Sequence, residues 1–426
     1  MSDIPMSDAE CALSMKRLEP RQRLYAQLLV RNGVNIQPDQ ELVVSAPVEA
    51  ADFVRLVVAT AYEMGAGHVT VIWGDDELSR LEYDNCPLER FKKLPSWKVE
   101  QMNSLAREGA AFLWLDGEDP DALLEVDPAK PAARSAASHR QCTEYRHGLD
   151  FGENSWCIGG VPVSAWAHKI FPSLSPAESM LRLWEAILET VRIVDEDPES
   201  AWETHDATLV KNKRHLNEAH FDALRYVSEN GTNFTVGLPA RHVWEGGSAK
   251  TKDGVRFFPN MPTEEVFTSP DRNRADGIVH SALPLVHNGS VIRDFWLRFE
   301  AGRVVEFGAE QGEEVLRHII ETDEGSRHLG ECALISKNTP IRQSGLLFYN
   351  TLYDENASCH LALGMGFPDC YENGVNMDKE SLLAAGVNDS ATHVDFMIGA
   401  DDLNIFGITV DGEEVPIFDH GQWSWE

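Results

Sequence analysis

The chain has 426 residues, of which 43% are hydrophobic and 25% are charged, so it is long enough for two or three globular domains. Its formal net charge of −32 argues against a general nucleic-acid binder or an anionic-membrane binder, because such a surface repels phosphate. No apolar run approaches the roughly 18 to 20 residues of a membrane span, and the N-terminal sequence lacks a signal-peptide pattern. Seven cysteines without a CxxC pair are typical of a reducing compartment, so we expect a cytoplasmic protein.

The first half of the chain predicts helices that alternate with buried strands. A strand, a helix and a second strand follow one another over residues 41–74, which predicts parallel pairing with a right-handed crossover. The pattern then repeats, so we expect a doubly wound α/β sheet. The predicted strands are 41–47, 68–74, 111–117 and 155–162, and the predicted helices are 20–33, 48–67, 97–110, 132–147 and 177–191.

Sheets of this kind often bind a nucleotide at the point where the strand order reverses. The turn after the first predicted strand reads APVEA, and the chain contains neither GxGxxG there nor a GxxxxGK[ST] motif anywhere. A structural or covering domain is therefore favoured over a nucleotide-binding one. The acidic stretch 196–206 has the composition of a linker. We therefore predict an α/β domain over residues 1–200 and a second domain over residues 201–426.

The second half predicts a different architecture. After a helix over 209–231, short β-rich runs separated by turn residues indicate an α+β domain with mainly antiparallel strands. Hairpin turns are expected at Ala301-Gly302 and Asp411-Gly412. The remaining predicted elements are strands within 233–238, 255–260, 277–286, 290–310 and the runs GECALISK, THVDFMIG and FGITVDGEEVPIF, with helices over 310–322 and 377–386.

Candidate functional residues come from separate apolar runs of this second half. In the strand-like run THVDFMIG, His393 and Asp395 fall on one face, where an imidazole and a carboxylate can bind one metal ion. His360 stands in the apolar run ASCHLALG, and Glu331 in LGECALI. Each has an ordinary alternative: a surface strand edge for His393 and Asp395, a hydrogen-bonded core histidine for His360, and an ion pair with Lys or Arg for Glu331.

Upstream, NMPTEEVF offers Glu264 and Glu265, of which an extended backbone points only one at the site. Together these runs supply three carboxylates and two imidazoles, more than the three protein ligands usual for one catalytic zinc. The set suits two divalent ions that share a carboxylate. Mixed oxygen and nitrogen donors are compatible with zinc, cobalt, manganese or magnesium. The sequence thus predicts a site for two divalent metal ions.

The order TEEVF, LGE, DENASCHLALG and THVDFMIG resembles the aminopeptidase T family of metallopeptidases, which includes the aminopeptidases S. The resemblance covers nearly the whole chain. It implies a cytoplasmic enzyme that releases N-terminal residues from peptides with a water molecule activated by two metal ions, and it implies a homodimer. The metal ligands that it implies are Glu265, Glu331, His360, His393 and Asp395, with Glu331 as our candidate for the shared ligand.

The chain departs from the family at one position. Where the family has a tyrosine before proline, this chain has Phe367, which can neither coordinate a metal nor donate a hydrogen bond. Tyr371 is a candidate substitute, and Glu264 is a candidate anchor for the substrate's amine. Two alternatives to the aminopeptidase stay open: another dinuclear hydrolase of amides or esters, and a relative that binds metal or peptide without turnover.

Overall fold

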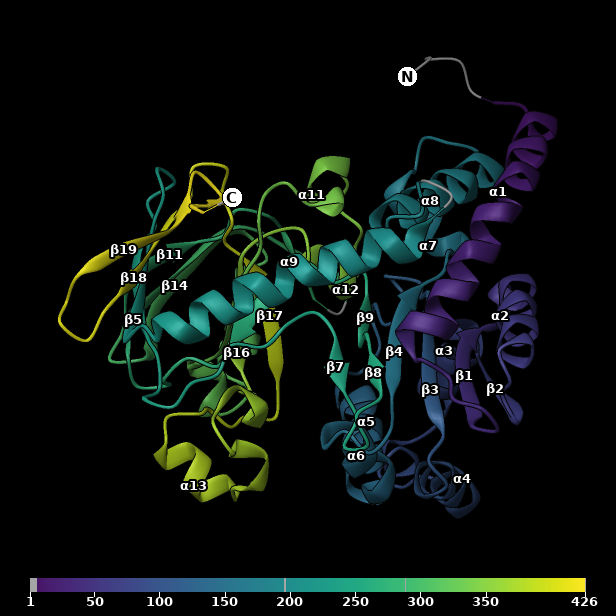
Figure 1. The fold of residues 1–426 in the computed structure, drawn as a ribbon, viewed down its shortest axis with the longest axis horizontal. Coiled ribbons are helices and arrows are strands. Elements are labelled where there is room, and N and C mark those ends of the chain that lie inside the picture. The colour runs from purple at the N-terminus through teal and green to yellow at the C-terminus, as the bar shows by residue number, and fades with distance from the viewer. Residues whose placement is uncertain (1–5, 195–196, 288, 426) are drawn as a thin grey trace. The chain divides into compact units, whose positions relative to one another are not determined.

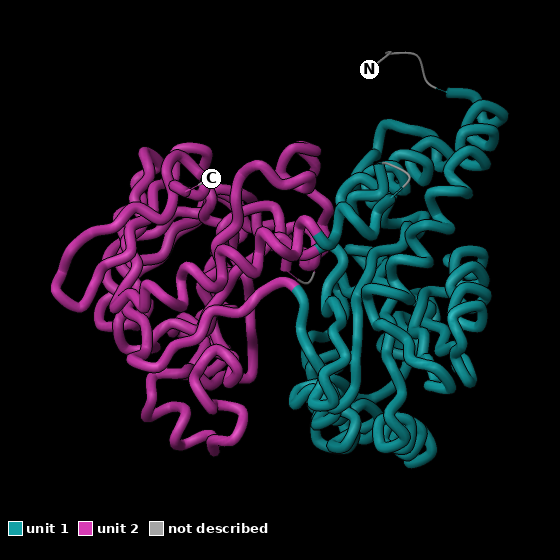
Figure 2. The backbone as a smooth tube through the Cα atoms, in the orientation of Figure 1, with its two compact units in different colours: residues 1–203, 248–262 teal, residues 204–247, 263–426 magenta. Residues whose placement is uncertain are grey.

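The computed structural model describes residues 6–194, 197–287 and 289–425. The chain forms two compact units, shown in different colours in Figure 2. Unit 1 comprises Met1–Glu203 and Ser248–Pro262, and unit 2 comprises Thr204–Gly247 and Thr263–Glu426. The sequence predicted one crossing near residue 200, whereas the chain also returns to unit 1 for residues 248–262. A division into separately folding domains stays a prediction. Within the described residues, none of the helices combines the length and the apolar character that crossing a bilayer requires.

Unit 1 is built on a parallel sheet, as the first half of the sequence predicted. Within the described residues its strand order is β2-β1-β3-β4-β9, and each neighbouring pair is parallel (Figure 1). The last strand comes from the returning segment of the chain, which also contributes the hairpin β7–β8. The strands are β1 Glu41–Pro47, β2 His68–Gly74, β3 Ala111–Asp116, β4 Trp156–Gly160, β7 Ala249–Lys250, β8 Arg256–Phe257 and β9 Asn260–Met261.

Two helices of unit 1 differ from the predicted bounds. The first helix begins at Asp8 and not after Pro20 as predicted, because Ser7 and Glu10 form a capping box that satisfies its first amides. The helix predicted over 132–147 is two helices that meet at Cys142. The helices are α1 Asp8–Leu28, a π turn Leu29–Gly33, α2 Ala51–Glu63, α3 Asp76–Asn85, α4 Ser96–Arg107, α5 Ala129–Gln141, α6 Thr143–Asp150, α7 Ser164–Ile170 and α8 Pro176–Thr190.

The segment predicted as a linker is mostly helix. Helix α9 spans Pro198–Ala219, and Asp197 accepts a hydrogen bond from the amide of Ser200 at 3.1 Å, which supports its first turn. Residue 196, the first of the predicted linker, lies outside the described residues. The predicted helix over 209–231 was wrong beyond Ala219, because Ala223–Val227 forms strand β5. An acidic composition was therefore insufficient evidence for a loop.

Unit 2 contains two antiparallel sheets, which confirms the predicted α+β architecture. In the described part of the chain, the larger sheet has the order β12-β13-β11-β6-β5-β18-β19-β20, with β14 paired to β13, and the smaller has the order β10-β15-β16-β17. The larger sheet comprises β5 Ala223–Val227, β6 Asn233–Gly237, β11 Ala275–His280, β12 Leu285–His287, β13 Ser290–Glu300, β14 Arg303–Gln311, β18 Asn404–Ile408, β19 Glu414–Asp419 and β20 Gln422–Trp423. The smaller sheet comprises β10 Val266–Thr268, β15 Leu329–Leu334, β16 His360–Gly364 and β17 His393–Met397.

Both predicted hairpin turns are present in unit 2. Ala301 and Gly302 both have positive φ, at 47° and 82°, as a type I′ hairpin turn requires. The second turn, between β18 and β19, contains Gly412 with φ 83°. Short helices connect the strands: α10 Glu313–Ile320, α11 Pro340–Ser344, α12 Thr351–Glu355 and α13 Lys379–Ala384.

Candidate metal centre

The register of the smaller sheet places four of the predicted donors on one face. Glu331 of β15 lies opposite Ala362 of β16, and Ala362 lies opposite Asp395 of β17. Opposed residues of antiparallel strands project from the same face, and so do residues two apart along a strand. His360 and His393, each two residues before one of these positions, therefore share this face. The small side chain of Ala362 stands at its centre and leaves room between the donors.

The opposite face of the same strands is apolar and fixes the register. It packs into the hydrophobic core of unit 2, where these residues are almost completely buried. A slip of one residue would exchange the two faces and turn the charged donors into the apolar core, so the core specifies where the donors point. The residues on the core side are Cys332, Leu334, Leu361, Leu363, Val394 and Phe396.

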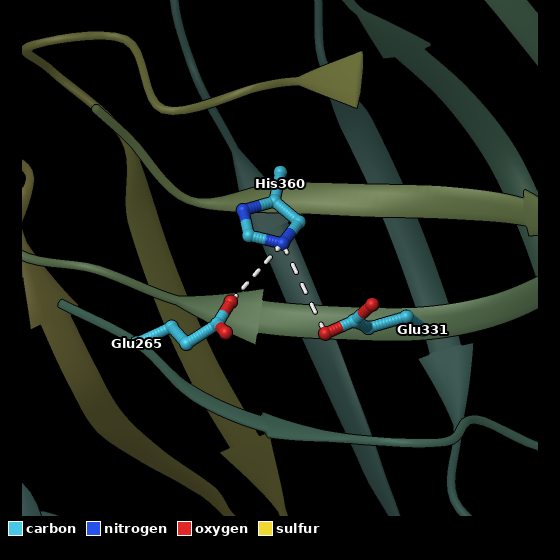
Figure 3. A group of neighbouring side chains, drawn as sticks. All are labelled: Glu265, Glu331 and His360. Atoms are coloured by element: carbon cyan, nitrogen blue, oxygen red, sulfur yellow. Dashed lines mark ion pairs between the residues drawn. The ribbon is translucent and has the colours of Figure 1, made fainter. Parts of the chain in front are cut away.

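The two neighbouring glutamates before β10 point to different partners. The Oε2 atom of Glu265 lies 3.4 Å from Nε2 of His360, within the candidate site (Figure 3). The Oε2 atom of Glu264 lies 3.6 Å from Nε2 of His205. This is the alternation expected of an extended segment. Glu265 therefore joins the face of the sheet that carries the other donors.

The five predicted donors form two overlapping groups. Glu265, Glu331 and His360 have ligand atoms within 4.8 Å of one another, and so do Glu331, His393 and Asp395. Glu331 belongs to both groups through different oxygens. Its Oε1 lies 3.9 Å from Nε2 of His360, and its Oε2 lies 3.0 Å from Nε2 of His393 (Figure 3 shows the first group).

Each imidazole is oriented by a backbone carbonyl. Nδ1 of His360 lies 3.0 Å from the carbonyl oxygen of Glu355, and Nδ1 of His393 lies 2.8 Å from that of Met365. A carbonyl only accepts hydrogen bonds, so Nδ1 of each ring donates. The Nε2 atoms of both rings are thereby directed toward the carboxylates. Metal-binding histidines usually donate their other ring N–H to a carbonyl or a carboxylate in this way.

The electrostatics of the site favour a bound cation. Burial and the neighbouring carboxylate of Glu331 raise the pKa of Glu265 to about 8. Burial opposes the charging of His393, but Asp395 and Glu331 outweigh it and raise the pKa of the imidazole well above its usual value. Within the described residues, the ion-pair partners of the three carboxylate ligand candidates are the two histidines and neither Lys nor Arg. The ion-pair alternative for Glu331 is therefore not what the structure shows.

The structure adds one carboxylate that the sequence reasoning missed. Glu355 ends helix α12, and burial together with the nearby charges of Asp395, Glu265 and Glu331 raises its pKa well above the usual value. It lies outside both donor groups. The signal for it was present in DENASCH, five residues before His360, but nothing in the sequence showed that a short helix would turn this side chain toward the site.

At the position where the family has a tyrosine, the ring of Phe367 packs against two other rings. The ring centroid of Phe367 lies 5.0 Å from that of His393 and 5.7 Å from that of Phe267. Tyr371 instead lies beside Arg241, whose guanidinium carbon is 5.6 Å from the centroid of the tyrosine ring. Phe367 therefore closes one side of the His393 imidazole with an apolar surface.

The sequence profile of the thermophilic metalloprotease family (M29) matches residues 18–423. The chain belongs to the M29 family. Among its M29 relatives, aminopeptidase AmpS of Bacillus subtilis is 46% identical over 401 residues, covering 94% of this chain and 98% of that protein. Aminopeptidase 2 of Geobacillus stearothermophilus is 46% identical over 412 residues, covering 97% of this chain and 100% of that protein. The structure of wild-type AmpT from Thermus thermophilus has a TM-score of 0.89 at 39% identity, covering 96% of this chain and all of that one.

These comparisons confirm the resemblance inferred from the motifs and the fold class that it implied. The M29 family is one of metalloproteases, and the relatives are named aminopeptidases, so this chain is a metal-dependent aminopeptidase, a hydrolase. Membership of a metalloprotease family also implies that the chain uses divalent metal ions. Which residues bind the metal, and how many ions they bind, depends on the geometry of unit 2.

Proposed function

We propose that the site holds two divalent ions and cleaves the N-terminal residue from peptides. Glu265, Glu331 and His360 would bind one ion, and Glu331, His393 and Asp395 the other. The observation that supports two ions is the placement of Glu331, whose two oxygens face two different histidines at 3.9 and 3.0 Å. A carboxylate in that position is suited to bridge a pair of ions.

The chemistry of the donor set fits metal binding. Four carboxyl groups, those of the three proposed ligands and of Glu355, face only two imidazoles, and burial together with the charge of Glu331 raises the pKa of Glu265. Divalent ions bound there would polarise the scissile carbonyl and lower the pKa of water toward neutrality. The mixture of nitrogen and oxygen donors is compatible with zinc, cobalt, manganese and magnesium alike. All of these donors belong to unit 2, and we therefore propose it as the catalytic part of the chain.

Glu355 is our candidate for proton transfer. Burial, together with the charges of Asp395, Glu265 and Glu331, raises its pKa, yet it stands outside both donor groups. A buried carboxyl group with a raised pKa can accept a proton from an attacking water molecule and return it to the leaving amine near neutral pH. Its helix ends next to Asn356, whose Nδ2 lies 3.4 Å from Oε1 of Glu355 and holds the carboxyl group.

The substrates that we propose are peptides with a free N-terminus, because the relatives are named aminopeptidases. We further propose a homodimer in the cytoplasm. The cytoplasmic location is supported by the cysteines, each of which is a free thiol in the described part of the chain.

One observation favours a second function, that of a relative with impaired turnover. Phe367 packs against His393 where the family resemblance implies a tyrosine hydroxyl. Such a protein would bind metal and peptides yet cleave slowly. Activity assays on the metal-loaded parent protein separate this function from that of an aminopeptidase, because a protein with impaired turnover would bind metal and cleave peptides slowly.

The test of the metal centre compares metal content with activity. His393→Ala should lose about one equivalent of bound metal and most of the hydrolysis of aminoacyl-p-nitroanilides. His242→Ala is the matched control, because His242 lies in unit 2 and its Nδ1 also bonds a carbonyl, that of Pro239 at 2.9 Å, but it lies outside both donor groups. Undiminished metal content and activity in His393→Ala would contradict the assignment.

A further inference from the structure

The orientation of His393 depends on the backbone of Met365. The carbonyl oxygen of Met365 receives the Nδ1–H of His393 at 2.8 Å, which leaves Nε2 to face Glu331 at 3.0 Å and Asp395 at 3.2 Å. The side chain of Met365 takes no part in this contact. A displacement of the Met365 carbonyl would release the ring to rotate, and Nε2 would no longer point at the two carboxylates.

A single buried residue, Asn388, holds the chain on both sides of Met365, through its side chain on one side and through its backbone carbonyl on the other. Nδ2 of Asn388 donates to the carbonyl of Gly364 at 2.6 Å, and the backbone carbonyl of Asn388 accepts from the amide of Gly366 at 2.9 Å. The same Nδ2 donates to the carbonyl of Gly325 at 2.8 Å. Asn388 is only 2% exposed, so removing its side chain takes the two bonds that Nδ2 donates away from the carbonyls of Gly364 and Gly325 in a buried place.

The surrounding backbone leaves the Met365 carbonyl little freedom to move. A Cβ atom added to Gly330 would lie 2.0 Å from that oxygen, and one added to Gly366 would lie 3.3 Å from the amide nitrogen of Asn388. The amide of Met365 in turn donates to the carbonyl of Thr392 at 2.8 Å. The segment from Gly364 to Gly366 is therefore held between β15 and the chain before His393, with Asn388 as its side-chain clamp.

We propose that Asn388 is a positioning residue of the metal centre, which sets the direction of the His393 Nε2 atom through the backbone of residues 364–366. Asn388 touches no donor itself. It is linked to the His393 ring through two hydrogen bonds, its own to the Gly364 carbonyl and that of the ring to the Met365 carbonyl. The inference rests on the proposed two-ion site, because it concerns how firmly one of that site's ligands is held. Partners of metal-binding histidines typically change metal affinity tenfold to a hundredfold when they are removed, and we expect about tenfold here because the effect is transmitted through a backbone segment.

Unit 1 offers a matched control. Asn154 is 1% exposed, and its Nδ2 donates to two backbone carbonyls, those of Ala106 at 3.1 Å and Ala110 at 2.9 Å. In both asparagines, Oδ1 is buried without a hydrogen-bond partner among the described residues. Replacing Asn154 therefore removes the same kind of clamp from a part of the chain that supplies none of the donors.

The experiment measures binding of Co²⁺ to the full chain by titration, followed through the visible absorption of the bound ion. Asn388→Ala should weaken the binding of one Co²⁺ about tenfold, whereas Asn154→Ala should leave both affinities within about twofold of the parent. The two substitutions should lower the free energy of unfolding of the metal-free protein by similar amounts. If Asn388→Ala does not fold, Asn388→Ser, which keeps one donor, enters the same comparison.

A double-mutant cycle separates positioning from general loosening of the fold. In a His393→Ala background, Asn388→Ala should change the remaining Co²⁺ affinity by less than about twofold, because the ring that it positions is gone. An equal loss with and without His393 would overturn the proposal, and so would a parent-like affinity in Asn388→Ala. A parent protein that binds no Co²⁺ would overturn the metal centre itself, and this inference with it.

Discussion

The burial of Glu265 beside Glu331 predicts that substitution of this one proposed ligand stabilises the metal-free protein. The pKa of Glu265 rises from its usual 4.5 to about 8, through burial and the charge of Glu331. The folded state then holds a proton that the unfolded state has already lost, so the free energy of unfolding falls as the pH rises from 4.5 to about 8. At about 1.36 kcal/mol per pKa unit, the full effect reaches about 5 kcal/mol above that range.

Glu265→Gln should remove this pH-dependent loss. In urea unfolding with a chelator present, the variant should be more stable than the parent by about 2 to 5 kcal/mol near pH 8.5 and by much less near pH 5. With Co²⁺ added the order should reverse, because a ligand that binds only the folded state stabilises the parent more than a variant that has lost a donor.

Glu264→Gln is the control, since Glu264 is the adjacent buried glutamate and its carboxylate faces His205 outside both donor groups. It should show no reversal of order on adding Co²⁺. A metal-free Glu265→Gln protein that is no more stable than the parent near pH 8.5 would refute the reasoning, because burial and the charge of Glu331 would then not disfavour the charged form of Glu265.

Four further predictions concern the same site. Glu331→Gln should abolish binding of both ions, whereas Asp395→Asn should abolish binding of one. Equilibrium dialysis with metal analysis distinguishes these results. An equal number of bound ions in the two variants would argue against a shared ligand. Glu355→Gln should retain metal but lower kcat by about a hundredfold or more, as loss of a proton-transfer group does, and an unchanged kcat would remove it from that role. Phe367→Tyr should raise turnover of aminoacyl-p-nitroanilides if a hydroxyl beside His393 assists the reaction, while an equal rate would show that the position only packs. Chelation of the parent should lower its melting temperature more near pH 8.5 than near pH 6, because Glu265 is protonated at the lower pH, and a loss independent of pH would contradict this.

The sequence alone predicted those parts of the fold that follow from the repeating pattern of apolar residues. The continuous apolar runs at 41–47 and 68–74 predicted parallel strands, which β1 and β2 form in register. Alternation in THVDF predicted that His393 and Asp395 share a face, and their contact at 3.2 Å agrees with it. These features depend on the local period of the backbone, which residue order specifies directly. The helix predicted over 209–231 was wrong in its second half, because helix α9 ends at Ala219 and the chain continues into strand β5.

Only the tertiary structure decided how the donors meet. Glu331, His360 and His393 lie on different strands, and their proximity follows from a register set by the apolar face beneath them. Glu355 stood in the DENASCH run, but the sequence did not show that its side chain reaches the site, because its position depends on a short helix packed beside the sheet. Likewise, the tie from Asn388 through Gly364 and Met365 to His393 joins segments far apart in the chain. Residue order fixed which atoms could bind a metal, but the long-range strand pairing brought them within reach of one ion, because such pairing depends on the packing of the whole core.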